Sequence, residues 1–171
     1  MPKILVARKP FIIGVMGSHE DNHTVMNDAR RLGEAIAERG YILLTGGGPG
    51  LMKVVSEGAY RAGGLVLGIL PNERNYPLHE YPNEFVDIAI YTGMNDARNV
   101  INAKTPHVLV ALSGGVGTLS EIALALRAGT PVIGLHCPSF AVPADSDFTA
   151  VNTVEEVLEE IDNILTRERK D

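Results

Sequence analysis

The sequence of 171 residues has no tryptophan, one cysteine and only 5% aromatic residues. A single cysteine, Cys137, cannot form an internal disulfide, which excludes the disulfide-rich scaffolds common among small secreted proteins. Its neighbour His136 supplies at most half of a metal site. We therefore expect Cys137 to be an ordinary core or loop thiol, and we expect no bound metal ion.

Long apolar runs and positive charge are also scarce. The apolar runs are shorter than the roughly 20 residues that a membrane-spanning helix needs, so no membrane segment is expected. Residues 1–10 carry three basic side chains around a short apolar patch, which lacks the length and the cleavage site of a signal peptide. The formal charge of −6 argues against nucleic acid as a partner, because such binding needs an extended basic surface. A cytoplasmic protein with a small anionic ligand remains compatible with this composition.

The order of apolar segments predicts the fold class. Short runs rich in Ile, Val and Leu alternate with helical patterns, which is typical of an α/β protein. We predict a Rossmann-like domain spanning residues 1–171, with a doubly wound, mostly parallel sheet of six to seven strands and helices on both faces. Residues 1–10 and 168–171 are expected to be flexible ends. The predicted strands span residues 11–16, 41–45, 65–70, 85–90, 107–112, 131–135 and, as a shorter seventh, 148–151.

Helices are predicted from apolar residues at helical spacing and from their end signals. Gly40, Gly63 and Gly129 each follow a helical pattern directly, as C-terminal capping residues do. Thr153 and Glu156 fit a capping box at the start of the last helix. The predicted helices span residues 25–39, 51–61, 119–127 and 153–167, and another begins within residues 95–99.

Glycine-bearing loops follow four of the predicted strands. In an open parallel sheet, ligands bind beyond the carboxyl ends of the strands, so these loops are expected to meet at one binding edge. The second loop is not a P-loop, because Lys53 lies outside a Gly-Lys-Ser/Thr frame, and with Glu73 as the one weak acidic candidate we expect no NAD. The candidate ligand-binding residues in the first, second and fourth loops are Gly17, Ser18, Gly46, Gly47, Gly48, Gly50 and Met94.

The run from Ser113 to Glu121 carries the most chemical information. It follows an apolar strand, turns on three glycines and opens a helix, so its backbone N–H groups can bind an anion such as phosphate. Glu121 then has two interpretations: a functional carboxylate beside the anion, or half of a capping box with Thr118. The candidate residues of this run are Ser113, Gly114, Gly115, Val116, Gly117, Thr118 and Glu121.

Arg98 is the second residue that stands out. A cation at the start of a helix opposes the helix dipole, whereas an anionic ligand or Glu121 would favour it there. The alternative is a solvated surface arginine. If the fourth and fifth strands lie close together, Arg98 and Glu121 can face one pocket, and Asn99 and Asn102 can add neutral hydrogen bonds.

These motifs resemble a known family over nearly the whole chain. The run Ser-Gly-Gly-Val-Gly-Thr-Leu-Ser-Glu at 113–121, the run Gly-Gly-Gly-Pro-Gly-Leu-Met at 46–52 and residues 94–99 are similar to the Lonely Guy superfamily. The resemblance implies a Rossmann-like fold, a homo-oligomer and hydrolysis of cytokinin riboside 5′-monophosphates, with Glu121 as the catalytic carboxylate and Arg98 as the catalytic arginine. The family's older label, lysine decarboxylase, does not fit, because neither Lys53 nor Lys104 lies in a setting suited to pyridoxal phosphate.

Two departures from the family pattern change the expected function. Ser113 stands where the family has proline, and Asn99 stands where it has lysine. This version looks more like a sister branch that includes the molybdenum cofactor carrier proteins, which bind a phosphate-bearing pterin without turning it over. The resemblance therefore implies a carrier of molybdenum cofactor as the first hypothesis and a nucleoside 5′-monophosphate phosphoribohydrolase as the alternative.

The hypotheses give Glu121 different roles. In a hydrolase its carboxylate would stabilise an oxocarbenium-like sugar, and Glu121→Gln would cut turnover at least about a hundredfold. In a carrier Glu121 can be purely structural, and Met16, Met94 and residues 71–82 can cover the ring system, although methionines are more often core residues. A nucleotide-sensing scaffold is a third and weaker interpretation.

Overall fold

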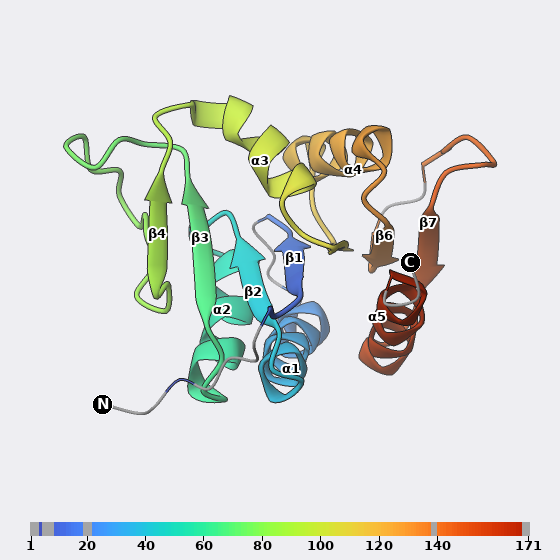
Figure 1. Cartoon of the computed structure of the whole chain (residues 1–171). Coiled ribbons are helices and arrows are strands. Elements are labelled where there is room, and N and C mark those ends of the chain that lie inside the picture. Colours follow the sequence, from blue (N-terminus) through green and yellow to red (C-terminus); the bar gives the residue numbers. More distant parts are fainter. Residues whose placement is uncertain (1–3, 5–8, 19–21, 138–139, 169–171) are drawn as a thin grey trace.

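The computed structural model describes residues 4, 9–18, 22–137 and 140–168. Its centre is one seven-stranded sheet in which every paired strand is parallel to its neighbours. The strand order is β4-β3-β2-β1-β5-β6-β7 (Figure 1). The strands are β1 (Ile12–Met16), β2 (Ile42–Thr45), β3 (Val66–Leu70), β4 (Ile88–Tyr91), β5 (Val108–Leu112), β6 (Val132–Leu135) and β7 (Phe148–Val151).

Helices lie on both faces of the sheet, and each face has its own apolar core. One core joins α1, α2 and α5 to side chains from β1, β2 and β5, and the other joins α3 and α4 to the alternate side chains of the same strands. Among the described residues, no helix has both the length and the apolar character to cross a membrane. The helices are α1 (His23–Glu38), α2 (Leu51–Arg61), the short 3-10 helix η1 (Asn95–Arg98), α3 (Asn99–Lys104), α4 (Val116–Ala128) and α5 (Val154–Glu168).

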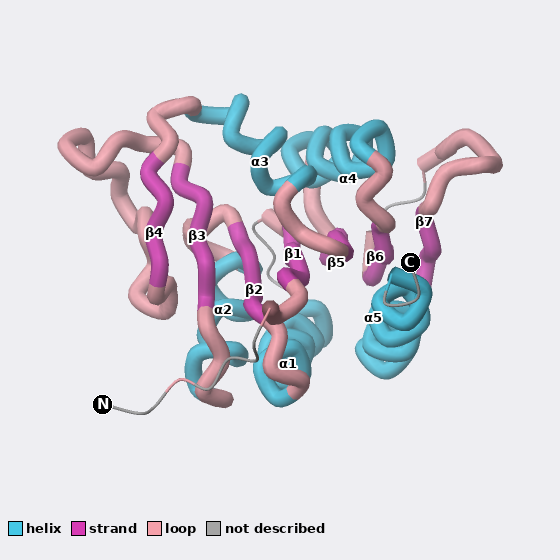
Figure 2. The backbone as a smooth tube through the Cα atoms, in the orientation of Figure 1, coloured by secondary structure: helices cyan, strands magenta, loops and turns pink. Residues whose placement is uncertain are grey.

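The path of the chain creates a switch point at the centre of the sheet. The chain moves outward from β1 through β2 and β3 to β4, then returns across the sheet to β5, beside β1 (Figure 2). The returning connection contains η1 and α3, and α3 packs against α4. Consequently the loops after β1 and β5 diverge to opposite sides, which opens a crevice at the carboxyl ends of these strands.

The predicted fold class and all seven predicted strands are confirmed, but two elements begin three residues away from their predicted starts. Helix α4 begins at Val116 rather than at residue 119, because Gly117 lies inside its first turn instead of in the loop. Strand β4 begins at Ile88 rather than at residue 85, because Phe85 packs on the ring of Tyr60 with centroids 5.7 Å apart, outside the sheet. The expected flexible ends, 1–10 and 168–171, fall largely outside the described residues.

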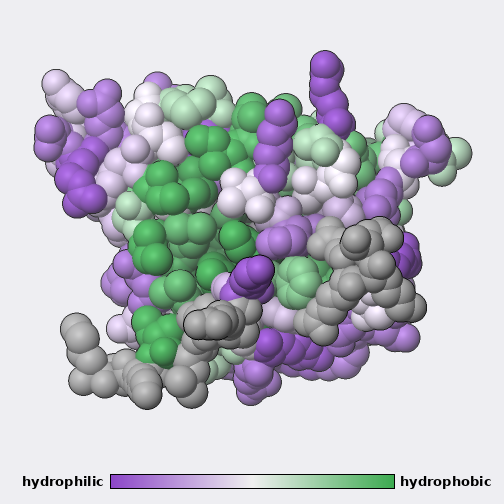
Figure 3. Space-filling model, in the orientation of Figure 1, coloured by the Kyte–Doolittle hydropathy of each residue, from purple (hydrophilic) through white to green (hydrophobic). Residues whose placement is uncertain are grey.

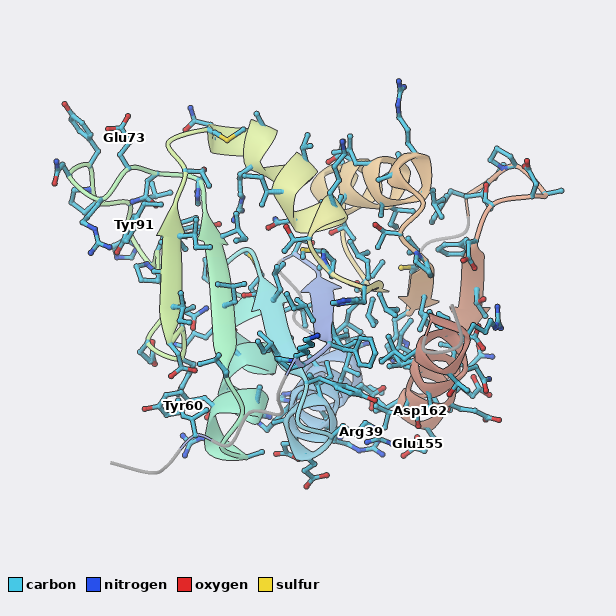
Figure 4. All side chains as sticks on the ribbon, viewed as in Figure 1. Arg39, Tyr60, Glu73, Tyr91, Glu155 and Asp162 are labelled. Carbon is cyan, nitrogen blue, oxygen red and sulfur yellow. The ribbon has the colours of Figure 1, made fainter. Side chains whose placement is uncertain are left out.

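The predicted end signals of the helices are largely confirmed. Gly40, Gly63 and Gly129 have φ of 71°, 79° and 81°, the left-handed conformation that a helix stop requires. In the capping box of α5, Thr153 Oγ1 accepts the Glu156 amide at 3.2 Å. Surface ion pairs connect α1 with α5, among them Arg39 with Asp162 at 3.8 Å (Figure 4).

Among the described residues, no helix covers one part of the sheet. On the face that carries α3 and α4, side chains of β2, β3 and β4 form an apolar surface (Figure 3). The side chains of Ile88 and Ile90 on the edge strand β4 are 46% and 43% exposed. The connection from β3 to β4 contains no helix, so this face lacks the cover that the rest of the sheet has.

Candidate functional site

A cavity of about 330 Å³ lies at the switch point. It is bounded by the loop after β1, the start of α2, the segment 95–99 and the first turns of α4. Of the residues predicted as the site, those that line this cavity are Gly17, Ser18, Gly50, Arg98, Asn99, Gly117, Thr118 and Glu121.

Arg98 reaches the cavity from the crossover connection. Its Nη1 donates hydrogen bonds to the backbone carbonyls of Gly46 and Ile69, at the carboxyl ends of β2 and β3. Arg98 is therefore anchored over the sheet and is not a freely solvated surface arginine. Arg98 was predicted to meet Glu121 if the fourth and fifth strands lie close together. That condition was wrong, because β4 is an edge strand and three strands separate it from β5. The two residues share a cavity because the crossover carries Arg98 back over the sheet.

Glu121 is buried in α4 and faces α3. Only 7% of its surface is exposed, and its Oε1 accepts a hydrogen bond from Asn102 Nδ2 at 2.9 Å. The capping-box interpretation was therefore wrong: the capping residue of α4 is Gly115, and its end has no side-chain cap. Burial raises the pKa of Glu121 above its ordinary 4.5, against the opposing effects of the Asn102 hydrogen bond and the Arg98 charge.

The environment of Glu121 favours its protonated form. Asn102 is fully buried, and its Oδ1 has no hydrogen-bond partner among the described residues. A protonated Glu121 brings a donor to this pair, whereas a carboxylate brings only acceptors. Arg98 and Glu121 form no ion pair in the described part of the chain, so Asn102, and not Arg98, holds the carboxyl group in place.

The amino end of α4 lines the cavity with backbone groups whose chemistry suits an anion. Gly115 carries no side chain that could cap the helix, so the N–H groups of the first turn keep their partial positive charge. A Cβ built on Gly117 would meet no atom within 4 Å, which leaves the backbone open to a ligand. Thr118 is 4% exposed and lines the cavity, and Asn99 Nδ2 donates to Ser120 Oγ at 3.2 Å beside it.

The second glycine loop contributes to the cavity in a different way from the prediction. Gly50 and Pro49 line it. The Leu51 amide at the start of α2 donates to the Ser18 carbonyl at 3.2 Å, which connects the loop after β2 to the loop after β1. Gly46, Gly47 and Gly48 are buried and do not line it. A Cβ on these glycines would meet Arg98, Leu70 and Tyr81 respectively, each at 2.8 Å or less. Their role in the structure is to make room for other side chains.

The cavity also has an apolar side that the sequence analysis largely missed. It consists of Met16, Met52, Pro49 and the ring of Tyr81. Met16 and residues 71–82 were named as a candidate cover, and Met52 ends the run 46–52, but no pattern singled out the side chain of Met52 or of Tyr81. A proline-bounded loop of 12 residues was the only signal for Tyr81, and it does not say which side chain faces the site. Asp96, on the rim, was missed as well.

The remaining predicted residues of the 113–121 run lie beside a second cavity. Ser113, Gly114, Gly115 and Val116 line an apolar hollow of about 290 Å³ between α4 and the loop after β6. Cys137 lines it too, and its thiol donates to the Ala111 carbonyl at 3.1 Å. Burial raises the pKa of this thiol to about 11, so Cys137 is neutral and has the predicted character of a loop thiol.

Several candidates lie away from both cavities. Met94 is 42% exposed and lines neither cavity. Glu73 lies at the outer edge of the sheet (Figure 4), where its Cγ would be 2.7 Å from a Cβ built on Gly93. His136 Nε2 is 2.8 Å from Asp28 Oδ2, and no group of three metal-ligating side chains occurs within the described ranges.

A seven-stranded parallel sheet with an arginine and a buried glutamate at its switch point defines the class of protein. The chain belongs to the superfamily of Lonely Guy enzymes and molybdenum cofactor carrier proteins. Within it, residues 10–164 match the SLOG cluster4 family, and the chain is a member of that family.

Solved structures and curated relatives point to the two branches of this superfamily. The molybdenum cofactor binding protein of Rippkaea orientalis matches with a TM-score of 0.83 and 40% identity, covering 93% of this chain and 99% of its own. The molybdenum cofactor carrier protein of Chlamydomonas reinhardtii matches with a TM-score of 0.81 and 35% identity, covering 91% and 99%. A cytokinin riboside 5′-monophosphate phosphoribohydrolase of Arabidopsis thaliana is 32% identical over 108 residues, 62% of this chain. The chain spans about half the length of that enzyme, 50%.

Proposed function

We propose that this protein binds a phosphate-bearing small molecule in the switch-point cavity and acts as a molybdenum cofactor carrier. The observation that carries the proposal is the joint presence of the Arg98 guanidinium and the uncapped amino end of α4 on one cavity. Charge-assisted hydrogen bonds and helix amides are the two devices that proteins use most for phosphate. The phosphate of the cargo would lie there, with its pterin ring toward the apolar side.

The burial of Glu121 supports a carrier over an enzyme. An oxocarbenium-like transition state is stabilised by an ionised carboxylate. Burial raises the pKa of Glu121, and Asn102 holds it as part of a buried pair. A raised pKa also makes Glu121 less unfavourable to an anion in this cavity, because its neutral form does not repel phosphate. The likeness to the two carrier structures over more than 90% of the chain supports the same choice.

Phosphoribohydrolase activity is the second candidate, and one observation favours it: Arg98 and Glu121 do line one cavity. In that reaction the bond between C1′ and the base nitrogen breaks, its electron pair leaves with the base, and water adds to C1′. The base takes up a proton and the water loses one, which gives free base and ribose 5-phosphate. Glu121 as carboxylate would stabilise the cationic sugar, while Arg98 would hold the 5′-phosphate.

One experiment separates the candidates. The purified protein is incubated with a panel of nucleoside 5′-monophosphates, and both products are separated by chromatography. In parallel, its binding of molybdopterin is titrated. A carrier binds the pterin with saturation and releases no base. Release of base and ribose 5-phosphate that falls at least about a hundredfold in Glu121→Gln would establish the hydrolase instead.

We also propose that the protein works in the cytoplasm as a homo-oligomer, with the uncovered face of β2–β4 as the contact surface. The exposed side chains of Ile88 and Ile90 on β4 support this. Sedimentation velocity tests it. The parent chain is expected to sediment as a dimer or larger, and Ile88→Lys with Ile90→Lys as a monomer. A parent chain that sediments as a monomer at micromolar concentration would reject this proposal.

A further inference from the structure

The ring of Tyr81 occupies a defined place beside the cavity. Tyr81 reaches it from the connection between β3 and β4, far in sequence from the other lining residues. The Arg98 guanidinium carbon lies 5.8 Å from the ring centroid, so the ring borders the group that we assign to phosphate binding.

The backbone around Tyr81 is clamped to the second glycine loop. The Asn83 amide donates to the Gly47 carbonyl at 2.8 Å, and Asn83 Nδ2 donates to the Gly48 carbonyl at 2.9 Å. Asn83 is only 5% exposed, so these bonds are shielded from water. The segment is therefore held in place next to the cavity, whereas Tyr76 in the same connection is 72% exposed.

Gly48 provides the surface on which the ring rests. A Cβ at position 48 would lie 2.3 Å from Tyr81 Cζ and 2.5 Å from its Cε1 and Oη. Gly48 has no positive φ that would demand glycine for conformational reasons. Glycine therefore lets the ring pack directly on the backbone, and any larger residue would displace the ring.

We infer that Tyr81 is a specificity-determining residue, whose ring stacks on a planar heteroaromatic ring carried by the phosphate ester. This inference rests on the proposed phosphate-binding function and adds the ligand class to it. A flat π-face beside a fixed cation suits a pterin or a nucleobase, and it offers nothing comparable to a bare sugar phosphate. Met16 and Met52 complete an apolar side of matching character.

Calorimetric titration of three phosphate esters tests this inference. The probes are ribose 5-phosphate, 6-hydroxymethylpterin phosphate and formycin 5′-monophosphate, whose C–C glycosidic bond resists hydrolysis. Binding of at least one aromatic ester is expected to be about tenfold tighter than that of ribose 5-phosphate, which is the scale of one stacking contact. Tyr81→Ala is expected to abolish this preference, so that the variant binds the aromatic esters no more tightly than it binds ribose 5-phosphate.

Three further variants separate stacking from a general structural effect. Gly48→Ala keeps the tyrosine but displaces its ring, so it is expected to lose the same preference. Tyr81→Phe keeps the ring and is expected to retain the preference. Tyr76→Ala removes an exposed ring from the same connection and serves as the matched control. Circular dichroism melting checks that each variant is folded.

The outcomes distinguish this inference from the proposed function. If ribose 5-phosphate binds and both Tyr81→Ala and Gly48→Ala keep the full preference for the aromatic esters, the role of Tyr81 is rejected and the phosphate site stands. The role is rejected equally if all three esters bind the parent chain with the same affinity. If no phosphate ester binds the folded parent chain, the proposed function falls, and this inference falls with it.

Discussion

The two glycine loops at the carboxyl edge of the sheet look alike in sequence but differ in what surrounds their glycines. In the loop after β2, Gly46, Gly47 and Gly48 are packed so closely that an added Cβ would meet another side chain at 2.8 Å or less. After β5, a Cβ on Gly114 would lie 2.2 Å from Thr118 Oγ1, but Gly115 and Gly117, at the start of α4, face open space with no atom within 4 Å of an added Cβ. The first loop makes room for protein side chains, and the second leaves its backbone open for a ligand.

This difference shows that the site has two layers. The inner layer is the amino end of α4, where backbone N–H groups are open to an anion. The outer layer is the loop after β2, which does not line the cavity at residues 46–48 but positions Arg98 and Tyr81, which do. Substitutions in the two loops are therefore expected to have different effects on stability and on ligand affinity.

The largest expected effect on stability is at Gly47. Its φ is +74°, and a Cβ would lie 2.3 Å from Leu70 Cδ2, so Gly47→Ala combines backbone strain with a clash. We expect a loss of ~2–4 kcal/mol in the free energy of unfolding, measured by urea denaturation. Gly63→Ala is the matched control, because Gly63 has φ +79° but open space around it. It is expected to cost only the conformational part, roughly 1–2 kcal/mol; equal losses in the two variants would show that Leu70 does not constrain the loop.

The next effect is on ligand binding and compares the loops directly. Gly46→Ala places a methyl group against Arg98 Nη1 and Met52 Sδ, at 2.8 and 2.7 Å, and both are ends of flexible side chains. The fold is expected to survive while Arg98 is displaced, so the affinity for ribose 5-phosphate falls about tenfold or more. Gly115→Ala, in open space and outside the switch-point cavity, is expected to change this affinity by less than about threefold. Calorimetry on both variants measures the contrast, and equal losses would remove the two-layer interpretation.

The sequence predicted the frame of the site better than its interior. Parallel strands buried on both faces are nearly continuous apolar runs, so all seven were identifiable, and the open edge followed from the fold class. Glycine, however, signals backbone freedom without saying what fills the space beside it. The same letters therefore predicted phosphate contact for Gly46 and for Gly117, and only the second lines the cavity. Tyr81 reaches the cavity through a connection without regular structure, which no periodic pattern describes.

The smallest expected effect concerns the pH dependence of stability that arises from the buried pair of Glu121 and Asn102. Because burial raises the pKa of Glu121, its neutral form is the one that the fold favours. The stability that this gives is complete at pH values below the ordinary 4.5 and is lost as pH rises through the raised pKa. Glu121→Gln stays neutral at every pH, so it is expected to be more stable than the parent chain at pH 7, by about 0.5–2 kcal/mol. The gain is expected to shrink toward zero as the pH falls to about 4.

Glu57 on α2 gives a control of opposite sign for that measurement. Burial alone would raise its pKa, but hydrogen bonds from Arg61 and Arg30 outweigh burial and lower the pKa. Its contribution to stability is therefore present above the ordinary 4.5 and is lost as pH falls. Glu57→Gln is expected to have a lower free energy of unfolding than the parent chain at neutral pH, and this difference is expected to shrink toward acid pH. Urea denaturation of the parent chain and both variants between pH 4 and pH 8 compares the two slopes. A Glu121→Gln difference that is constant across this range would show that folding does not raise the pKa of Glu121, which would remove the argument for a neutral acid and favour the hydrolase.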